Sequence, residues 1–261
     1  ALAADSADIW AGQRGTLTLA RNDDEAERQQ RALKAFDWPD KVMRAVTAAE
    51  ASDILGVSVA HPGLWFPTAG TLKPPRVTQH LLRGIDITRA RVAALEALTT
   101  DYDAVVLAAG TGVLDLLAPD TLPMRANRGQ LTYIRDMVDA PNVAVTYGGY
   151  MTPAVTLPDD VVGHVLGATY ARHGEVPAAD WNRLRDDDHA TMLETLNAYL
   201  PGMDDAMVIG GRTALRATVR DYLPIVGKLS DGVWTLTGLG SRGFLTAPLL
   251  KKSTLVFTPC A

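Results

Sequence analysis

The sequence has 261 residues, of which 47% are hydrophobic and 21% are charged, with a formal net charge of −5 at pH 7. This composition is ordinary for a soluble globular protein. The acidic balance gives no general attraction to nucleic acid, although it is compatible with a local basic patch. No stretch reaches the roughly 18 consecutive apolar residues typical of a membrane helix. The first residues show no basic and then apolar segment, so the sequence gives no indication of a secretory signal. We therefore expect no membrane partner.

A single cysteine, Cys260, excludes an internal disulfide framework and a multi-thiolate zinc site. It also fits a reducing, cytoplasmic compartment. The histidines show neither i, i+4 spacing nor an HExxH pattern, so we expect no metal site; they are His61, His80, His164, His173 and His189. The first residue is Ala1 rather than Met, and residues 1–7 have the composition of the middle of a helix. We therefore expect the sequence to begin partway into a longer protein.

The first predicted element is a helix over residues 23–37. Asn22 or Asp23 can cap it, and acidic residues fill its first turn. Trp38-Pro39 ends it, because the residue before a proline is disfavoured in helical conformation.

Short elements follow this helix. Thr47-Ala-Ala-Glu50 has the spacing of a capping box and predicts a second helix through Leu55. Residues 64–66 predict a short apolar strand. Two prolines then predict the first turn of a helix over residues 74–82.

The middle of the chain predicts two kinds of strand. Residues 85–92 and 104–108 are predicted to be strands. The second run is apolar without alternation, as expected of a strand buried on both faces of a parallel sheet. Residues 129–135, 143–147 and 164–170 alternate in part, which predicts an antiparallel sheet with one open face. The two layers are therefore expected to interleave along the chain.

Residues 182–200 predict the clearest helix, with a stripe of leucines and an end at Pro201. Its acidic run at residues 186–188 is interpreted as a solvated helix face rather than a metal site. Residues 211–217 and 233–237 predict the last strands.

A glycine-rich turn follows the last predicted strand. Gly238-Leu-Gly-Ser-Arg-Gly243 matches GxGxxG and precedes a helix-compatible run over residues 244–252. Glycines in this setting let backbone N–H groups at a helix N-terminus reach a negatively charged or electron-rich ligand. Too few residues follow for a βαβ unit, and no acidic residue stands at the spacing that binds a ribose. The turn is therefore not expected to be the main phosphate loop, and a simple helix-capping turn is the alternative.

Two further segments have residues suited to ligand contact. The strand over residues 104–108 runs into small residues at Ala108, Ala109 and Gly110, which allow a ligand or another backbone to approach closely. Arg216 stands among apolar neighbours, where an arginine needs a carboxylate or phosphate partner. On these residues alone, close strand–helix packing explains the first segment equally well. A structural Asp or Glu is the simplest partner for Arg216.

In combination these segments resemble the D-amino-acid-oxidase-type superfamily of FAD enzymes. The resemblance is greatest to the FAD-dependent half of the bifunctional enzyme that modifies the wobble uridine of bacterial tRNA. The matching stretches, in the order of the family, are residues 63–75, 122–130, 148–153, 167–170, 215–227 and 238–250.

The resemblance implies an α/β fold with two interleaved layers. An FAD-binding Rossmann-like layer, incomplete and without its N-terminal βαβ unit, would comprise residues 1–8, 83–120 and 205–261. A substrate layer built on a mixed, largely antiparallel sheet would comprise residues 9–82 and 121–204.

The resemblance also implies roles for individual residues. Arg216 would pair with a substrate carboxylate, and Tyr150 and Arg242 would line the same pocket. The residues expected to contact FAD are Ala108, Ala109, Gly110, Gly238, Leu239, Gly240, Ser241, Arg242 and Gly243. The backbone N–H groups of the glycine turn would favour the negative charge that a flavin gains on reduction.

The implied reaction is hydride transfer to FAD from the carbon next to an amine nitrogen, followed by hydrolysis of the imine. In the tRNA branch, carboxymethylaminomethyl uridine would lose its carboxymethyl group as glyoxylate. The implied partners are a carboxylate-bearing amine, carried on tRNA, and a methyltransferase, the half of the bifunctional enzyme that this sequence lacks. The alternatives are an enzyme of free glycine, sarcosine or D-amino acids, and a degenerate domain that binds without catalysis.

The sequence departs from the family pattern in three places. The N-terminal βαβ unit is missing, the segment over residues 85–103 is short, and the apolar tail over residues 253–261 does not continue the last helix. Segments missing from this sequence and genuine deletions explain these departures equally well. In either case we expect this polypeptide to retain FAD weakly.

Overall fold

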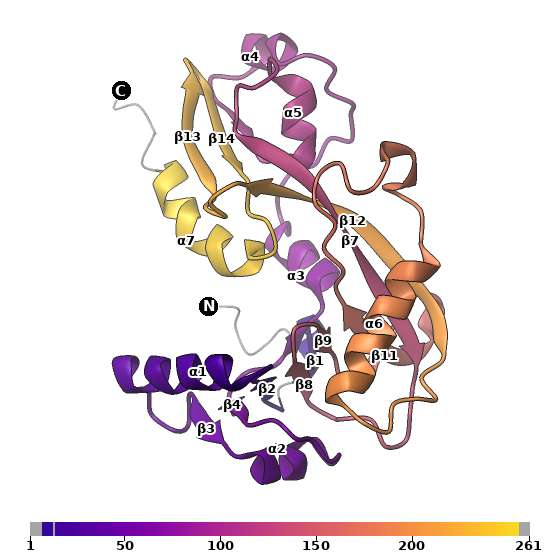
Figure 1. The fold of residues 1–261 in the computed structure, drawn as a ribbon. Coiled ribbons are helices and arrows are strands. Elements are labelled where there is room, and N and C mark those ends of the chain that lie inside the picture. Colours follow the sequence, from indigo (N-terminus) through magenta and orange to yellow (C-terminus); the bar gives the residue numbers. More distant parts are fainter. Residues whose placement is uncertain (1–6, 13, 256–261) are drawn as a thin grey trace. The chain divides into compact units, whose positions relative to one another are not determined.

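The computed structural model describes residues 7–12 and 14–255 (Figure 1). The chain forms two compact units. Unit 1 comprises Ala1–Asp86, Gln130–Thr169 and Leu184–Arg212, and unit 2 comprises Ile87–Gly129, Tyr170–Arg183 and Thr213–Ala261. These boundaries reflect packing alone, so the division into FAD-binding and substrate layers, which refers to ligands, stays a prediction. The helical segment expected over residues 1–7 lies outside the described residues, apart from Ala7, which begins a 3₁₀ turn.

The first helix of unit 1, α1 (Asp23–Phe36), forms where its cap predicts it. The Asn22 side chain accepts a hydrogen bond from the Glu25 N–H at 2.9 Å. The helix ends as Asp37 adopts a left-handed conformation with φ 44°. The predicted cap and end are therefore confirmed.

The next two helices, α2 (Ala48–Leu55) and α3 (Pro74–Leu81), also follow their local signals. In α2 the Thr47 hydroxyl accepts from the Glu50 N–H at 3.2 Å, and the Glu50 carboxylate accepts from the Thr47 N–H at 2.8 Å. This confirms the predicted capping box. Helix α3 begins with two prolines, which lack the N–H groups that a first helical turn leaves unpaired.

Most strands of unit 1 belong to one mixed sheet. Its order is β12-β7-β11-β9-β8-β2-β4-β3, and β10 pairs with β11. The strands are β2 (Thr16–Leu19), β3 (Arg44–Val46), β4 (Gly63–Phe66), β7 (Met124–Arg135), β8 (Ala144–Thr146), β9 (Tyr150–Met151), β10 (Val155–Thr156), β11 (Val162–Gly167) and β12 (Val208–Val219). Residues 124–129 of β7 and residues 213–219 of β12 belong to unit 2. Strands β7 and β11 pair antiparallel, as do β8 and β9, whereas β2 and β8 are parallel. The largely antiparallel sheet is confirmed.

Other elements of unit 1 are smaller. Strands β1 (Trp10–Gly12) and β5 (Thr71–Leu72) pair antiparallel, and 3₁₀ turns occur at Ala7–Ile9 and Pro158–Asp160. No helix among the described residues is both long enough and apolar enough to cross a membrane.

The long helix α6 (Asp186–Tyr199) lies beside β11 (Figure 1) and begins four residues later than the predicted start at 182. Gln130 explains the later start. Its side-chain oxygen accepts from the Arg185 N–H, and its amide donates to the Arg185 carbonyl, both at 2.9 Å. Arg185 is therefore held in extended conformation outside the helix, with φ −124°.

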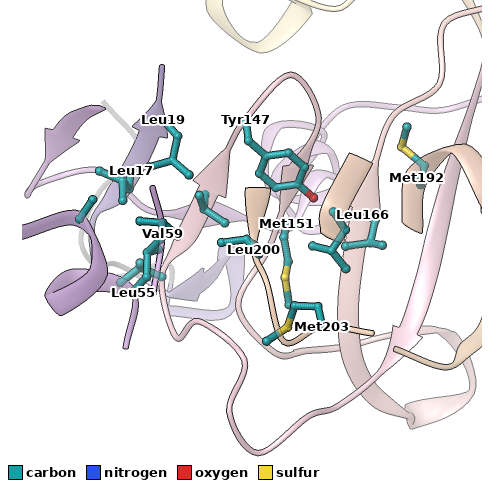
Figure 2. Packing of buried hydrophobic residues seen from close by; sticks show 14 of the residues in the cluster. Leu17, Leu19, Leu55, Val59, Tyr147, Met151, Leu166, Met192, Leu200 and Met203 are labelled. Carbon is teal, nitrogen blue, oxygen red and sulfur yellow. The ribbon is translucent and has the colours of Figure 1, made fainter. Parts of the chain in front are cut away.

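The core of unit 1 lies between the sheet and helices α2 and α6. Figure 2 shows Tyr147, Met151, Leu166 and Leu200 packed together there; each is at most 2% exposed. Burying a side chain of this size contributes about 1.5–3 kcal/mol relative to its exposed state. The same burial raises the pKa of the Tyr147 phenol well above its usual value.

Unit 2 is built on a three-stranded sheet of order β13-β14-β6. Its elements are α4 (Glu96–Asp101), β6 (Val105–Leu107), α5 (Val113–Leu116), β13 (Ile225–Ser230), β14 (Val233–Thr237) and α7 (Gly243–Leu255), with 3₁₀ turns at Gly110–Gly112 and Ala178–Asp180. Strands β6 and β14 are parallel and β13 is antiparallel to β14. Helix α7 packs against β13 and β14. The α/β fold class is thus confirmed within this unit.

Three sequence predictions for this region are wrong. Residues 85–92 are exposed and form no strand, because no described strand offers them hydrogen-bonding partners. Val106 is 49% exposed, so β6 is not buried on both faces. It is an edge strand of the three-stranded sheet, and its Val105 and Leu107 side chains belong to the core. Helix α7 continues through Leu255, so the first residues of the predicted tail are helical. Residues 256–261 lie outside the described residues.

Candidate functional site

Two of the predicted ligand-contacting segments meet at one edge of the unit 2 sheet. Because β6 and β14 are parallel, with Leu107 opposite Thr235, the segments that follow them leave the same edge. The Thr237 hydroxyl donates to the Gly110 carbonyl at 3.1 Å and joins the two segments directly. Ligands of open α/β sheets bind outside the carboxyl ends of the strands, which is where these segments lie.

The glycine turn depends on its glycines. Gly238 and Gly240 have φ values of 69° and 55°, a conformation that other residues adopt only with strain. A Cβ at Gly238 would lie only 2.7 Å from a methyl carbon of Val219. The Gly240 N–H donates to the Ala217 carbonyl at 2.8 Å, which ties the turn to β12. Helix α7 begins at Gly243, so its first N–H groups, which have no partner inside the helix, lie at this turn.

A pocket of about 200 Å³ opens beside the turn. Its lining residues are Thr218, Val219, Tyr222, Gly238, Leu239, Gly240, Ser241 and Arg242. Complete ligand pockets are typically about 300–1,000 Å³, so this space suits one ring system rather than a whole dinucleotide. An electron-rich ring edge fits the positive end of α7 in this position.

Arg216, on β12, lies over the backbone of β7. A Cβ at Gly129 would collide with all three terminal atoms of the Arg216 guanidinium. The guanidinium carbon also lies 5.5 Å from the centre of the Tyr170 ring, within the range of a cation–π interaction. The half-buried guanidinium therefore occupies a space that a side chain at position 129 would close.

A buried hydrogen-bond network adjoins Arg216. The Asn127 amide donates to the Tyr170 hydroxyl at 2.7 Å and to the Thr218 hydroxyl at 2.6 Å. The Asn127 side-chain oxygen accepts from the His173 N–H at 2.9 Å. Sequence reasoning missed these residues as parts of a site, although Asn127 and Tyr170 belong to the stretches that carry the family resemblance. The feature that could have identified them is Asn127, a polar residue within a strand that is buried at this position.

A larger pocket of about 500 Å³ includes Asn127, Tyr170 and Thr218. The exposed side chains of Arg125, Arg172 and Arg220 also line this pocket. The remaining lining residues are Asp120, Leu122, Pro123, Met124, His173, Glu175, Val219 and Tyr222. Within the part of the chain that the structure describes, none of the three arginines, nor Arg242, forms an ion pair, whereas arginines of unit 1 such as Arg21 and Arg44 do.

The third predicted substrate contact, Tyr150, belongs to unit 1. Tyr150 is paired with Gly167 across β9 and β11, and its ring lies over the backbone of Gly167. Arg216 and Arg242 belong to unit 2, so the grouping of all three in one pocket stays a prediction. The described residues contain no group of three His, Cys, Asp or Glu side chains placed to hold a metal ion.

The sequence matches a known protein family. Residues 1–254 match the family described as FAD dependent oxidoreductase (DAO). The tRNA 5-methylaminomethyl-2-thiouridine biosynthesis bifunctional protein MnmC of Marinobacter nauticus is 32% identical over 93% of this chain. The protein of the same name from Magnetococcus marinus is 29% identical over 95% of the chain. The chain spans only 42% and 44% of these two proteins.

Solved structures share the fold. Glycine oxidase from Bacillus cereus superposes with a TM-score of 0.71 at 18% identity, covering 95% of this chain and 72% of that one. Iminodiacetate oxidase from Chelativorans sp. superposes with a TM-score of 0.70 at 20% identity, covering 95% and 73%. The family match confirms the resemblance found in the sequence: the chain belongs to the DAO family of FAD-dependent oxidoreductases.

Proposed function

We propose that this protein oxidises the C–N bond of a carboxylate-bearing secondary amine, namely the carboxymethylaminomethyl group of a tRNA wobble uridine. The Arg216 guanidinium, seated over Gly129 beside Tyr170, is the observation that carries this proposal. The names of the sequence relatives support the tRNA substrate. A structural neighbour is named for iminodiacetate, which is itself an amine with two carboxymethyl groups.

FAD, when bound, would supply the two-electron oxidation by accepting a hydride from the carbon between the amine nitrogen and the carboxylate. The glycine turn and the N-terminus of α7 would hold the electron-rich edge of its ring system, through backbone N–H groups. The small residues of the neighbouring segment would leave room for the ring to approach. The residues proposed for this contact are Ala108, Ala109, Gly110, Gly238, Leu239, Gly240, Ser241, Arg242 and Gly243.

Arg216 would bind and orient the substrate. A planar guanidinium can donate two parallel hydrogen bonds to a carboxylate, which fixes the direction of the adjacent C–H bond. The absence of a side chain at Gly129 leaves the space that this orientation needs. Arg242 and Tyr150 are each proposed as further substrate contacts. Water then hydrolyses the oxidised C=N bond, which releases the carboxymethyl carbons as glyoxylate and leaves an aminomethyl uridine.

The arginines of the larger pocket favour a substrate carried on RNA over a free amino acid. Arg125, Arg172 and Arg220 are exposed and lack ion-pair partners among the described residues, although the whole chain has a net charge of −5. A free amino acid needs one cation for its carboxylate, whereas a phosphate backbone attracts several. Tyr222, 62% exposed beside them, offers a surface for base stacking. A methyltransferase is the proposed partner, because a methylaminomethyl product requires methylation of the aminomethyl group.

Oxidation of free glycine or sarcosine is the second candidate, because glycine oxidase shares the fold. The test is anaerobic mixing of the flavin-loaded protein, purified from its full-length gene, with each candidate substrate. Bleaching of the flavin by carboxymethylaminomethyl-modified tRNA at low concentration is the expected result. Bleaching by glycine or sarcosine alone would replace the first candidate with the second. If the full-length protein did not bind FAD, the third alternative, a domain that binds a ligand without catalysis, would apply.

A further inference from the structure

We infer that Tyr170 is a positioning residue: its ring and its tethered hydroxyl fix the Arg216 guanidinium in the orientation that grips a carboxylate. This inference rests on the proposed function, because it takes Arg216 as the carboxylate contact. It adds Tyr170, with Asn127 behind it, to the residues that determine specificity for a carboxylate.

The ring of Tyr170 limits the freedom of Arg216. An arginine side chain has several rotatable bonds, so a guanidinium held at its base alone would sample many orientations. Here the guanidinium lies against the backbone of Gly129 and 5.5 Å from the centre of the Tyr170 ring. These two surfaces together restrict the plane in which its donors point.

The Tyr170 ring is 41% exposed, so a tether at its hydroxyl adds to the restraint that packing provides. Its hydroxyl accepts a 2.7 Å hydrogen bond from the amide of Asn127, which is only 8% exposed. The backbone beside the ring is also fixed, because Ala171 and Arg128 exchange hydrogen bonds of 2.9 and 3.1 Å in an isolated bridge. The ring is thus attached at both ends to β7, the strand that carries Gly129.

Asn127 in turn has its polar groups occupied. Its second amide hydrogen is donated to the Thr218 hydroxyl, and its oxygen accepts from the His173 N–H. The Thr218 hydroxyl donates onward to the Arg125 carbonyl at 3.2 Å. Buried networks with every member satisfied are rigid, so the position of the Tyr170 hydroxyl is defined by the core rather than by solvent.

The test compares Tyr170→Phe and Tyr170→Leu with the unchanged protein, using flavin-loaded full-length enzyme. The substrates are 5-carboxymethylaminomethyl uridine and its amide, in which a carboxamide replaces the carboxylate. We expect Tyr170→Leu to lower kcat/KM for the carboxylate by about tenfold or more, since misplaced catalytic groups have effects of this size. Tyr170→Phe keeps the ring and loses the hydroxyl tether. Its kcat/KM for the carboxylate is therefore expected to lie between those of the unchanged protein and Tyr170→Leu. Neither substitution should change kcat/KM for the amide.

A double-mutant cycle separates positioning from general damage to the fold. In an Arg216→Ala background, Tyr170→Leu should cause no further loss, because the residue through which it acts is gone. Tyr102→Phe, an exposed tyrosine at the end of α4, is the matched control and should behave as the unchanged protein. Equal losses for carboxylate and amide, or additive losses in the cycle, would overturn the inference.

A binding measurement gives a readout that does not depend on catalysis. Methoxyacetate, the ether counterpart of sarcosine, carries the carboxylate without the amine, and calorimetry measures its affinity. Tyr170→Leu should weaken it by about tenfold, in line with the kinetic loss. Unchanged affinity would overturn the positioning role. If Arg216→Ala leaves both this affinity and the kinetics unchanged, Arg216 does not bind the carboxylate, and the proposed function fails as well. Unchanged values for Tyr170→Leu alone would overturn only the positioning role.

Discussion

The guanidinium of Arg216 lies so close to the backbone of Gly129 that any side chain at position 129 would collide with it. The two residues come from strands β12 and β7, far apart in the sequence. The neighbouring contact between Asn127 and Thr218 fixes the same alignment of these strands. The observed position of the Arg216 guanidinium therefore requires that position 129 has no side chain.

Gly129→Ala should displace the Arg216 guanidinium and lower kcat/KM for a carboxylate-bearing amine by about 10- to 100-fold, since small misplacements of a binding group are costly. Steady-state kinetics measures the change. Gly12→Ala is the control, because a Cβ added there meets nothing within 4 Å. An unaltered kcat/KM in Gly129→Ala would show that the arginine does not bind substrate from this position.

Arg216→Ala should weaken transition-state binding by about 2–5 kcal/mol, the range for removing one partner of a buried charge pair. Arg216→Lys should recover only part of this loss, because an ammonium cannot form two parallel hydrogen bonds with a carboxylate. The measurement is kcat/KM for the carboxylate substrate and for its amide. A lysine variant with full activity would exclude the bidentate grip.

Gly238→Ala should reduce the FAD content of the purified protein. An alanine at φ 69° is strained by about 1–2 kcal/mol, and its Cβ would also meet Val219 at 2.7 Å. The ratio of flavin to protein absorbance after gel filtration measures the loss. A second substitution, Val219→Ala, should restore part of the FAD by removing the steric conflict. Full FAD content in Gly238→Ala would argue against the glycine turn as a cofactor contact.

Replacing Arg172 and Arg220 by glutamate should weaken tRNA binding and reduce its dependence on salt. Each lost phosphate contact is expected to lower the log–log salt slope by about 1. Fluorescence anisotropy with labelled tRNA at several salt concentrations gives this slope. Arg31→Glu serves as the control, because Arg31 already pairs with Glu27 on helix α1. Equal slopes for all variants would place RNA binding elsewhere.

Acid should destabilise unit 1 through Glu25. The hydrogen bond from Arg21 holds the pKa of this carboxyl below its ordinary value. The folded state therefore binds the proton less readily than the unfolded state does. The resulting stabilisation is complete above the unfolded pKa and is lost as the pH falls through the folded pKa. Thermal unfolding at pH 7 and at about pH 3 should show a difference between the wild type and Glu25→Gln that shrinks in acid. A constant difference would assign the effect to another group.

The sequence alone determined the elements whose signals are local. Helices α1 and α2 begin where Asn22 and the Thr47–Glu50 capping box predict, because a cap involves residues only three positions apart. The strand over residues 233–237 and the glycine turn after it are also predicted, since β-branched and aromatic residues favour a strand and glycines favour a turn. The motifs that carry the family resemblance were equally visible, and the family match confirms them.

The tertiary structure decided everything that depends on distant partners. Residues 85–92 are predicted to be a strand but form none, because a strand requires a neighbour that the sequence does not reveal. Helix α6 starts late because Gln130 holds Arg185 from 55 positions away. The bonds from Asn127 to Tyr170 and Thr218 join residues 43 and 91 positions apart. Only the alignment of β7 with β12 brings such residues together beside Arg216, because hydrogen bonds and packing act over a few ångströms of space regardless of separation along the chain.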